Sequence, residues 1–175
     1  MLLSEIHKNT KEKFDKFKIE TSEIDSRAII KKILGLNDKD FIMDIEISLS
    51  LKENQCLSKV ISERLSGKPL SRIFGSKEFF SMRFAINEFV LDPRPESEIL
   101  VEKALHLIQE NNFKSILELG VGSGCIIAAI LSNSIGTKAV GIDISEKAIM
   151  TAKSNLIKND IKNFNLIIGD WSLSI

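Results

Sequence analysis

The chain has 175 residues, of which 43% are apolar and 27% are charged, a composition typical of folded globular domains. Its 24 basic and 24 acidic side chains balance, and neither half has a large excess of one charge, so no direct binding of nucleic acid is expected. No run of about 18 apolar residues could span a membrane, and the charged start lacks a signal-peptide apolar stretch. We therefore expect a cytoplasmic protein without a membrane partner.

The cysteines and histidines give no sign of a metal centre. Cys56 and Cys125 lie far apart and form no CxxC pair, and His7 and His106 have no ligand partner at helical spacing. We expect both thiols to be small buried residues and the protein to hold no metal.

The first part of the chain, residues 1–75, is predicted to be a helical domain. Apolar residues recur at helical spacing over 24–34 and 56–65, and Gly35 and Gly67 follow as stop signals. Weaker patterns predict a helix at about 2–17 and one or two shorter helices within 38–50.

A linker, residues 76–96, is predicted to follow. The alternating, aromatic-rich run 78–86 favours a short β-hairpin. Asp-Pro-Arg-Pro at 92–95 cannot lie inside a helix, because each proline fixes its own φ and favours extended geometry before it. Ser97 is then expected to cap a helix. The apolar face of that helix would comprise Leu100, Val101, Ala104, Leu105 and Ile108.

The last part, residues 97–175, is predicted to be an α/β domain. Strands are expected at 115–119, 138–142 and 166–168, separated by an apolar helix at 125–131 and an amphipathic one at 148–156. Strands that alternate with helices of 10–15 residues indicate right-handed βαβ units and a parallel sheet.

The first of these strands ends in the sequence ELGVGSG, residues 118–124. Glycines at such a turn allow positive φ and let a ligand approach without a Cβ in the way. The free N–H groups of a helix that begins near Ser123 suit a carboxylate or a phosphate. Asp143, at the end of the next strand, could accept hydrogen bonds from both hydroxyls of a ribose. Turn, helix and acid together predict an adenosine-type cofactor.

The position of the third glycine distinguishes two such cofactors. The dinucleotide fingerprint G-x-G-x-x-G, counted from Gly120, needs a glycine at position 125, where the chain has Cys125. Glu118 suits a ligand that carries an ammonium and a sulfonium, so S-adenosylmethionine is favoured over NAD. Asp170 could bind the adenine amino group and Trp171 the adenine ring. The predicted cofactor-binding residues are Glu118, Gly120, Val121, Gly122, Ser123, Gly124, Asp143, Asp170 and Trp171.

These motifs resemble a known family. The stretch 65–171 resembles the release factor glutamine methyltransferases of the HemK/PrmC type. The matching elements are residues 67–75, 78–79 and 90–98, the glycine turn, Asp143, Ala152 with Asn155, and 169–171. The Pro-Arg-Pro-Glu piece is the most specific, since general methyltransferases lack it. Two positions depart from the family pattern, Asp92 for an apolar residue and Ser97 for a threonine.

The resemblance implies a fold and an activity. The fold would be a helical domain that docks a protein substrate, a β-hairpin linker, and the first half of a Rossmann-like methyltransferase sheet that binds S-adenosylmethionine. The activity would be methyl transfer to the side-chain amide of the glutamine in the GGQ motif of peptide chain release factors. Cofactor contacts would come from Gly120 through Gly124, Asp143 and Trp171.

The resemblance also predicts a missing part. The family positions the substrate amide with an Asn-Pro-Pro-Tyr loop after its fourth strand, and this sequence contains no Asn-Pro. We therefore expect a truncated chain with no assignable catalytic residue. Ile116, Leu117 and Leu119 would lie on an open sheet edge, prone to aggregation or paired with a second chain that completes the sheet.

Three alternatives stay open at this point. The chain could be a related amino-methyltransferase with a nucleic-acid substrate, or a dinucleotide oxidoreductase. It could also be a non-catalytic or split fragment that binds S-adenosylmethionine or a release factor.

Overall fold

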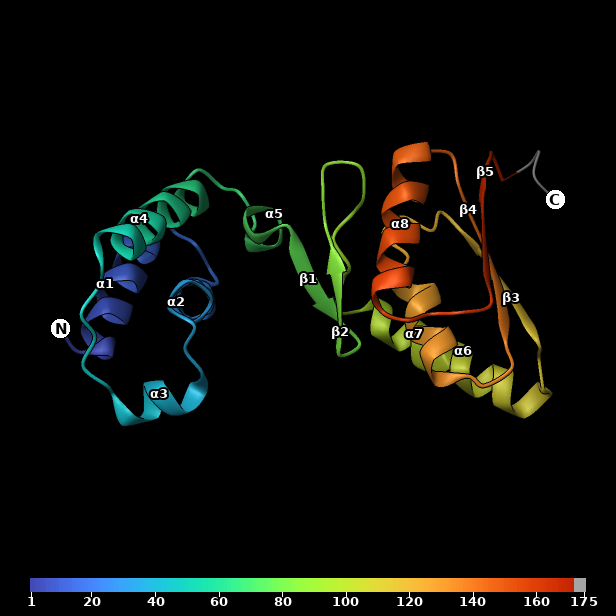
Figure 1. Cartoon of the computed structure of the whole chain (residues 1–175), viewed down its shortest axis with the longest axis horizontal. Coiled ribbons are helices and arrows are strands. Elements are labelled where there is room, and N and C mark those ends of the chain that lie inside the picture. Colours follow the sequence, from blue (N-terminus) through green and yellow to red (C-terminus); the bar gives the residue numbers. More distant parts are fainter. Residues whose placement is uncertain (172–175) are drawn as a thin grey trace. The chain divides into compact units, whose positions relative to one another are not determined.

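The computed structural model describes residues 1–171 and divides the chain into two compact units (Figure 1). The first unit is Met1–Ile73, and the second begins at Phe74. The last four residues of the predicted domain 97–175 lie outside the described residues. No described helix combines the length and apolar character needed to cross a membrane.

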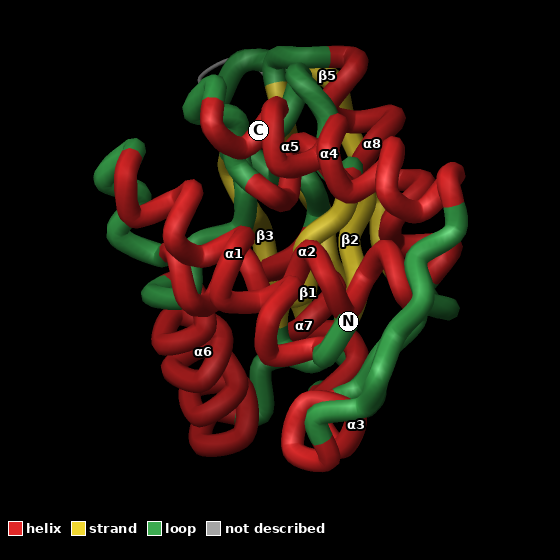
Figure 2. The backbone as a smooth tube through the Cα atoms, turned by 90° about the vertical axis from the view of Figure 1, so that its left-hand side faces the viewer, coloured by secondary structure: helices red, strands yellow, loops and turns green. Residues whose placement is uncertain are grey.

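The first unit is built from helices. They are α1 (Leu3–Lys16), α2 (Ser22–Leu34), α3 (Asp38–Met43), α4 (Leu51–Leu65) and the short α5 (Leu70–Phe74). Their apolar stripes meet in a core that includes Leu3, Phe14, Ile29, Ile30 and Leu57. Gly35 ends α2 in the left-handed conformation at φ 67°, which confirms the predicted stop. The loop after α3, green in Figure 2, returns to the start of the chain through a bridge between Glu46 and Leu2.

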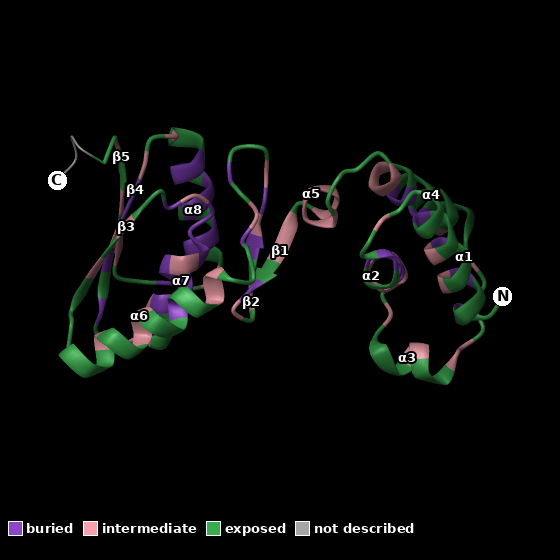
Figure 3. Cartoon of the chain, turned by 180° about the vertical axis from the view of Figure 1, so that it is seen from behind, coloured by how far each residue is buried: buried purple, intermediate pink, exposed green. Residues whose placement is uncertain are grey.

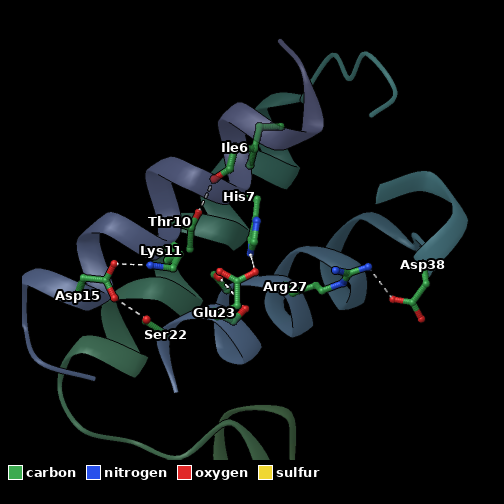
Figure 4. Close-up of polar contacts among 10 residues, drawn as sticks. Ile6, His7, Thr10, Lys11, Asp15, Ser22, Glu23, Arg27 and Asp38 are labelled. Atoms are coloured by element: carbon green, nitrogen blue, oxygen red, sulfur yellow. Dashed lines mark hydrogen bonds and ion pairs between the residues drawn. The ribbon is translucent and has the colours of Figure 1, made fainter. Parts of the chain in front are cut away.

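Polar contacts connect the helices of the first unit. The His7 imidazole on α1 lies 3.5 Å from the Glu23 carboxylate on α2, and Arg27 pairs with Asp38 at 3.1 Å (Figure 4). A more buried pair joins α4 to α2, where the Arg64 guanidinium lies 2.7 Å from the Asp25 carboxylate. Cys56, predicted to be buried, is exposed on α4, so that prediction is wrong.

The second unit begins with the predicted hairpin. Strands β1 (Ser76–Phe79) and β2 (Met82–Ala85) pair antiparallel, and the two turn residues Phe80 and Ser81 have φ of 50° and 61°. Positive φ at both positions is the geometry of a two-residue hairpin turn. The Phe80 backbone N–H donates to the Glu98 carboxylate at 2.9 Å, which fixes the turn to the next helix.

A parallel α/β unit follows the hairpin. Its elements are α6 (Ser97–Asn111), β3 (Ser115–Leu119), α7 (Cys125–Asn133), β4 (Lys138–Asp143), α8 (Glu146–Lys158) and β5 (Phe164–Ile168). The three strands pair parallel in the order β3-β4-β5. The α/β fold predicted from the sequence, with helices first, a hairpin next and a parallel sheet last, is confirmed.

The start of α6 differs from the prediction. Glu96, not Ser97, is the N-cap residue, and no side chain forms a cap hydrogen bond there. Ser97 is the first helical residue, and its backbone N–H donates to the Arg94 carbonyl at 3.0 Å. The helical turn therefore begins within the Pro-Arg-Pro segment, and the Ser97 hydroxyl is not used as a cap.

One face of the sheet carries most of the core. Helices α7 and α8 show many buried residues, whereas α6 is largely exposed and buries fully only Val101 (Figure 3). Gly141 on β4 lies so close to this layer that an added Cβ would stand 2.8 Å from the Ile127 side chain. On the opposite face, Leu117 and Leu119 of β3 remain half exposed among the described residues. Leu100, predicted to face the core, is also exposed.

Candidate cofactor site

The glycine turn lies directly after β3, where the parallel strands end. Gly120, Gly122 and Gly124 all have positive φ, of 80°, 52° and 77°, which side chains with a Cβ rarely adopt. The N–H groups of Gly120 and Val121 both donate to the Ile142 carbonyl, at 2.8 and 3.0 Å, and so attach the turn to β4. The turn is therefore held from its first residue.

The third glycine also permits a close contact with a helix. A Cβ at Gly124 would lie 3.2 Å from the Cα and the Cβ of Ala152 on α8. The backbone of the turn thus packs directly against α8, and α7 begins at the next residue, Cys125.

Asp143 occupies the end of β4, as predicted, and faces the turn. One carboxylate oxygen accepts the Gly122 N–H at 2.9 Å, and the other accepts the Ser145 N–H at 2.9 Å. A carboxylate oxygen can accept more than one hydrogen bond, so each retains capacity for a further donor. The carboxylate is therefore fixed in orientation and still able to bind hydroxyl groups.

Glu118 lies on β3 beside this carboxylate. It accepts the Ile127 N–H from α7 at 3.1 Å. Burial raises the pKa of Glu118 from its ordinary value of 4.5 to about 8, and the negative charge of Asp143 adds to the effect, although the Ile127 N–H opposes it. A carboxylate in this position is one that a cationic ligand group would stabilise.

These residues line a cleft of about 390 Å³ in the second unit. One wall is the glycine turn with Glu118, Cys125, Ile126 and Asp143, and the other is the segment 89–94 with Ser97. Six of the predicted residues therefore lie together: Glu118, Gly120, Val121, Gly122, Ser123 and Asp143. The sequence analysis did not assign the second wall to the site, although the Pro-Arg-Pro motif within it was the signal that could have indicated this.

Asp170 and Trp171 lie near the turn, but they do not line this cleft. They follow β5, whose end is joined to β4 by the Gly169 N–H donating to the Asp143 carbonyl at 3.0 Å. The Trp171 ring is 58% exposed, and its Cζ2 atom would stand 3.7 Å from a Cβ at Gly120. The ring therefore borders the turn on its open side.

The described residues include no group of three or more His, Cys, Asp or Glu side chains that could hold a metal ion. The chemistry of the cleft rests instead on carboxylates, one guanidinium, hydroxyls and backbone N–H groups.

Two family models match the chain. The PrmC N-terminal domain matches residues 5–75, and a methyltransferase domain matches residues 99–174. Among solved structures, a tRNA (uracil-54, C5)-methyltransferase from Pyrococcus abyssi, in complex with S-adenosyl-L-homocysteine, is 18% identical. That likeness covers 54% of this chain and 23% of the other, with a TM-score of 0.45.

Sequence relatives extend over most of the chain. A release factor glutamine methyltransferase from Buchnera aphidicola subsp. Schizaphis graminum is 36% identical over 152 residues, covering 87% of this chain and 55% of that protein. One from Caulobacter vibrioides is 32% identical over 158 residues, covering 90% and 55%. A bifunctional methyltransferase from Rickettsia typhi is 31% identical, covering 97% and 36%. The chain is thus a homologue of the release factor glutamine methyltransferases and spans about half the length of those it matches.

Proposed function

We propose that the chain provides the S-adenosylmethionine site of a methyltransferase that acts on peptide chain release factors. The observation that carries the proposal is the Asp143 carboxylate, held by the Gly122 and Ser145 N–H groups at the mouth of the cleft. The homologues support the choice of substrate class, because those named above are release factor glutamine methyltransferases.

The residues present fit this cofactor. The glycine turn leaves a surface without side chains against which a ligand can lie, and Asp143 can accept the two ribose hydroxyls. Glu118, whose pKa is raised by burial, would pair with the positively charged methionine end. Trp171, exposed beside Gly120, would border the adenine, with Asp170 next to it.

The cofactor supplies a methyl group on a sulfonium, which is already an activated leaving group. The role of this chain would be to bind and orient that group, since positioning can account for a large part of such a rate. No residue of the chain is proposed as a catalytic base. The substrate would be the glutamine amide of the GGQ motif, and the helical unit would dock the release factor in the cytoplasm.

Calorimetric titration with S-adenosylhomocysteine tests the cofactor site. We expect saturable binding by the native chain, no binding of NAD, and a loss of at least about tenfold in affinity for Asp143→Ala. Asp160→Ala, an exposed acid after α8, is the matched control and should bind as the native chain does. No heat with S-adenosylhomocysteine from folded protein would overturn the proposal.

Surface plasmon resonance with the full chain tests the protein substrate separately. A release factor with an intact GGQ domain should bind saturably, and a control protein of equal size and charge should not. Failure here, together with normal cofactor binding, would remove the release factor and retain the methyltransferase site.

We also propose that a second polypeptide chain, in the simplest case another copy, completes the sheet. Among the described strands β3 pairs only with β4, so one edge is open, and Leu117 and Leu119 leave an apolar face beside it. Light scattering should therefore report self-association that Leu117→Lys reduces. Ile157→Lys, at an exposed position on α8, should leave the association unchanged. A native chain that stays monomeric at high concentration would contradict this proposal.

A further inference from the structure

The wall of the cleft that the sequence analysis did not assign carries a cation. Arg94 lies between the two prolines of the Pro-Arg-Pro segment, is exposed, and lines the cleft together with Ser97. It forms no ion pair with any carboxylate in the part of the chain that the structure describes. Pro93 is buried and fixes the backbone on one side of it, so the residue stands on a rigid segment.

The opposite wall carries the complementary charge. Glu118 lines the same cleft from β3, where its carboxylate is held by the Ile127 N–H at 3.1 Å. A guanidinium and a buried carboxylate on facing walls complement a group that has a carboxylate at one end and an ammonium at the other. An α-amino acid is such a group, and the homocysteine part of the cofactor is an α-amino acid.

We infer that Arg94 binds the carboxylate of the cofactor's amino-acid end, that Ser97 donates a second hydrogen bond to it, and that Glu118 binds its ammonium. This inference rests on the proposed function and adds a specificity-determining residue to it. Arginine suits the role because its planar guanidinium can donate two parallel hydrogen bonds to one carboxylate. The Ser97 hydroxyl is available because it does not cap α6.

The consequence is a site that reads both charges of one ligand. The Pro-Arg-Pro segment would then act as a cofactor-binding element rather than only as a linker between the hairpin and α6. Ligands that keep the adenosine but lack one charge should lose the contribution of one wall and keep that of the other.

Calorimetry with three ligands tests the assignment: S-adenosylhomocysteine, its decarboxylated analogue and its deaminated analogue. Arg94→Ala should weaken binding of S-adenosylhomocysteine and the deaminated analogue at least about tenfold, and change the decarboxylated analogue less than about twofold. Glu118→Gln should give the reverse pattern, with the deaminated analogue unaffected. Arg83→Ala, which removes an exposed arginine of β2 outside the cleft, is the control and should match the native chain for all three.

Each other outcome is decisive. Native affinity of Arg94→Ala for S-adenosylhomocysteine would overturn the inference and leave the proposed function intact. An equal loss for all three ligands would also overturn it, because Arg94 would then act on the adenosine or on the fold. If the native chain bound none of the ligands, both the proposed function and the inference would fall.

Discussion

The side-chain amide of Asn155 on α8 pairs with both backbone polar groups of Ala85 on β2. Its oxygen accepts the Ala85 N–H at 2.8 Å, and its nitrogen donates to the Ala85 carbonyl at 3.1 Å and to the Ser123 carbonyl at 2.9 Å. Asn155 is only 1% exposed. One buried residue therefore joins the hairpin, α8 and the glycine turn.

The variant Asn155→Asp should destabilise the second unit by about 3 kcal/mol, because a carboxylate oxygen would replace the donor that faces two carbonyls. Urea unfolding measures the difference. The control is Asn159→Asp, which loses a similar bond to the Arg83 carbonyl at a more exposed position and should cost less than about 1 kcal/mol. Equal costs for both variants would show that burial at Asn155 is not the cause.

Stability should depend on pH through Glu118. The folded chain keeps the Glu118 proton up to about pH 8, whereas the unfolded chain releases it near 4.5. Unfolding between these values releases a proton, so the free energy of unfolding should fall as pH rises, by at most about 1.4 kcal/mol per pH unit. Urea unfolding from pH 5 to pH 8.5 measures this slope. Glu118→Gln should flatten it, and an unchanged slope in that variant would assign the dependence to another group.

Two glycines with similar backbone angles should respond differently to alanine. Gly124 and Gly136 have φ of 77° and 81°, so each substitution carries strain of about 1 kcal/mol. A Cβ at Gly136 meets nothing within 4 Å, whereas one at Gly124 meets Ala152 at 3.2 Å. We expect Gly124→Ala to cost about 1–2 kcal/mol more than Gly136→Ala in thermal or urea unfolding. Equal costs would mean that α8 moves freely away from the turn.

The helical unit should depend on one ion pair more than on others. Arg64 and Asp25 are 16% and 12% exposed, so Arg64→Ala leaves a largely buried carboxylate without its partner. We expect a loss of about 3 kcal/mol, against less than about 0.5 kcal/mol for Lys68→Ala, which breaks the more exposed pair with Glu63. Helix content followed during urea unfolding distinguishes the two variants. A similar small loss in both would rank the Arg64 pair with the exposed ones.

Local sequence patterns were sufficient for the elements but not for the second wall of the cleft. The strands, the hairpin and the Asp143 position follow from alternation, turn residues and spacing, all of which act over a few residues. The contact between the segment 89–94 and the glycine turn joins residues distant in sequence, so no local pattern reports it. The predicted cap at Ser97 was wrong because the helical turn already begins at Glu96, where the backbone is in the right-handed helical region.

The two backbone N–H groups that hold Asp143 have a consequence for how a ligand is captured. The side chain loses its rotamer freedom when the protein folds, so ordering it adds no entropic cost to the later association step. Ligand binding should therefore leave the χ1 angle of Asp143 unchanged. Loosening either N–H contact would transfer that ordering cost to the encounter with the ligand, and affinity would fall even though every group that touches the ligand was still in place.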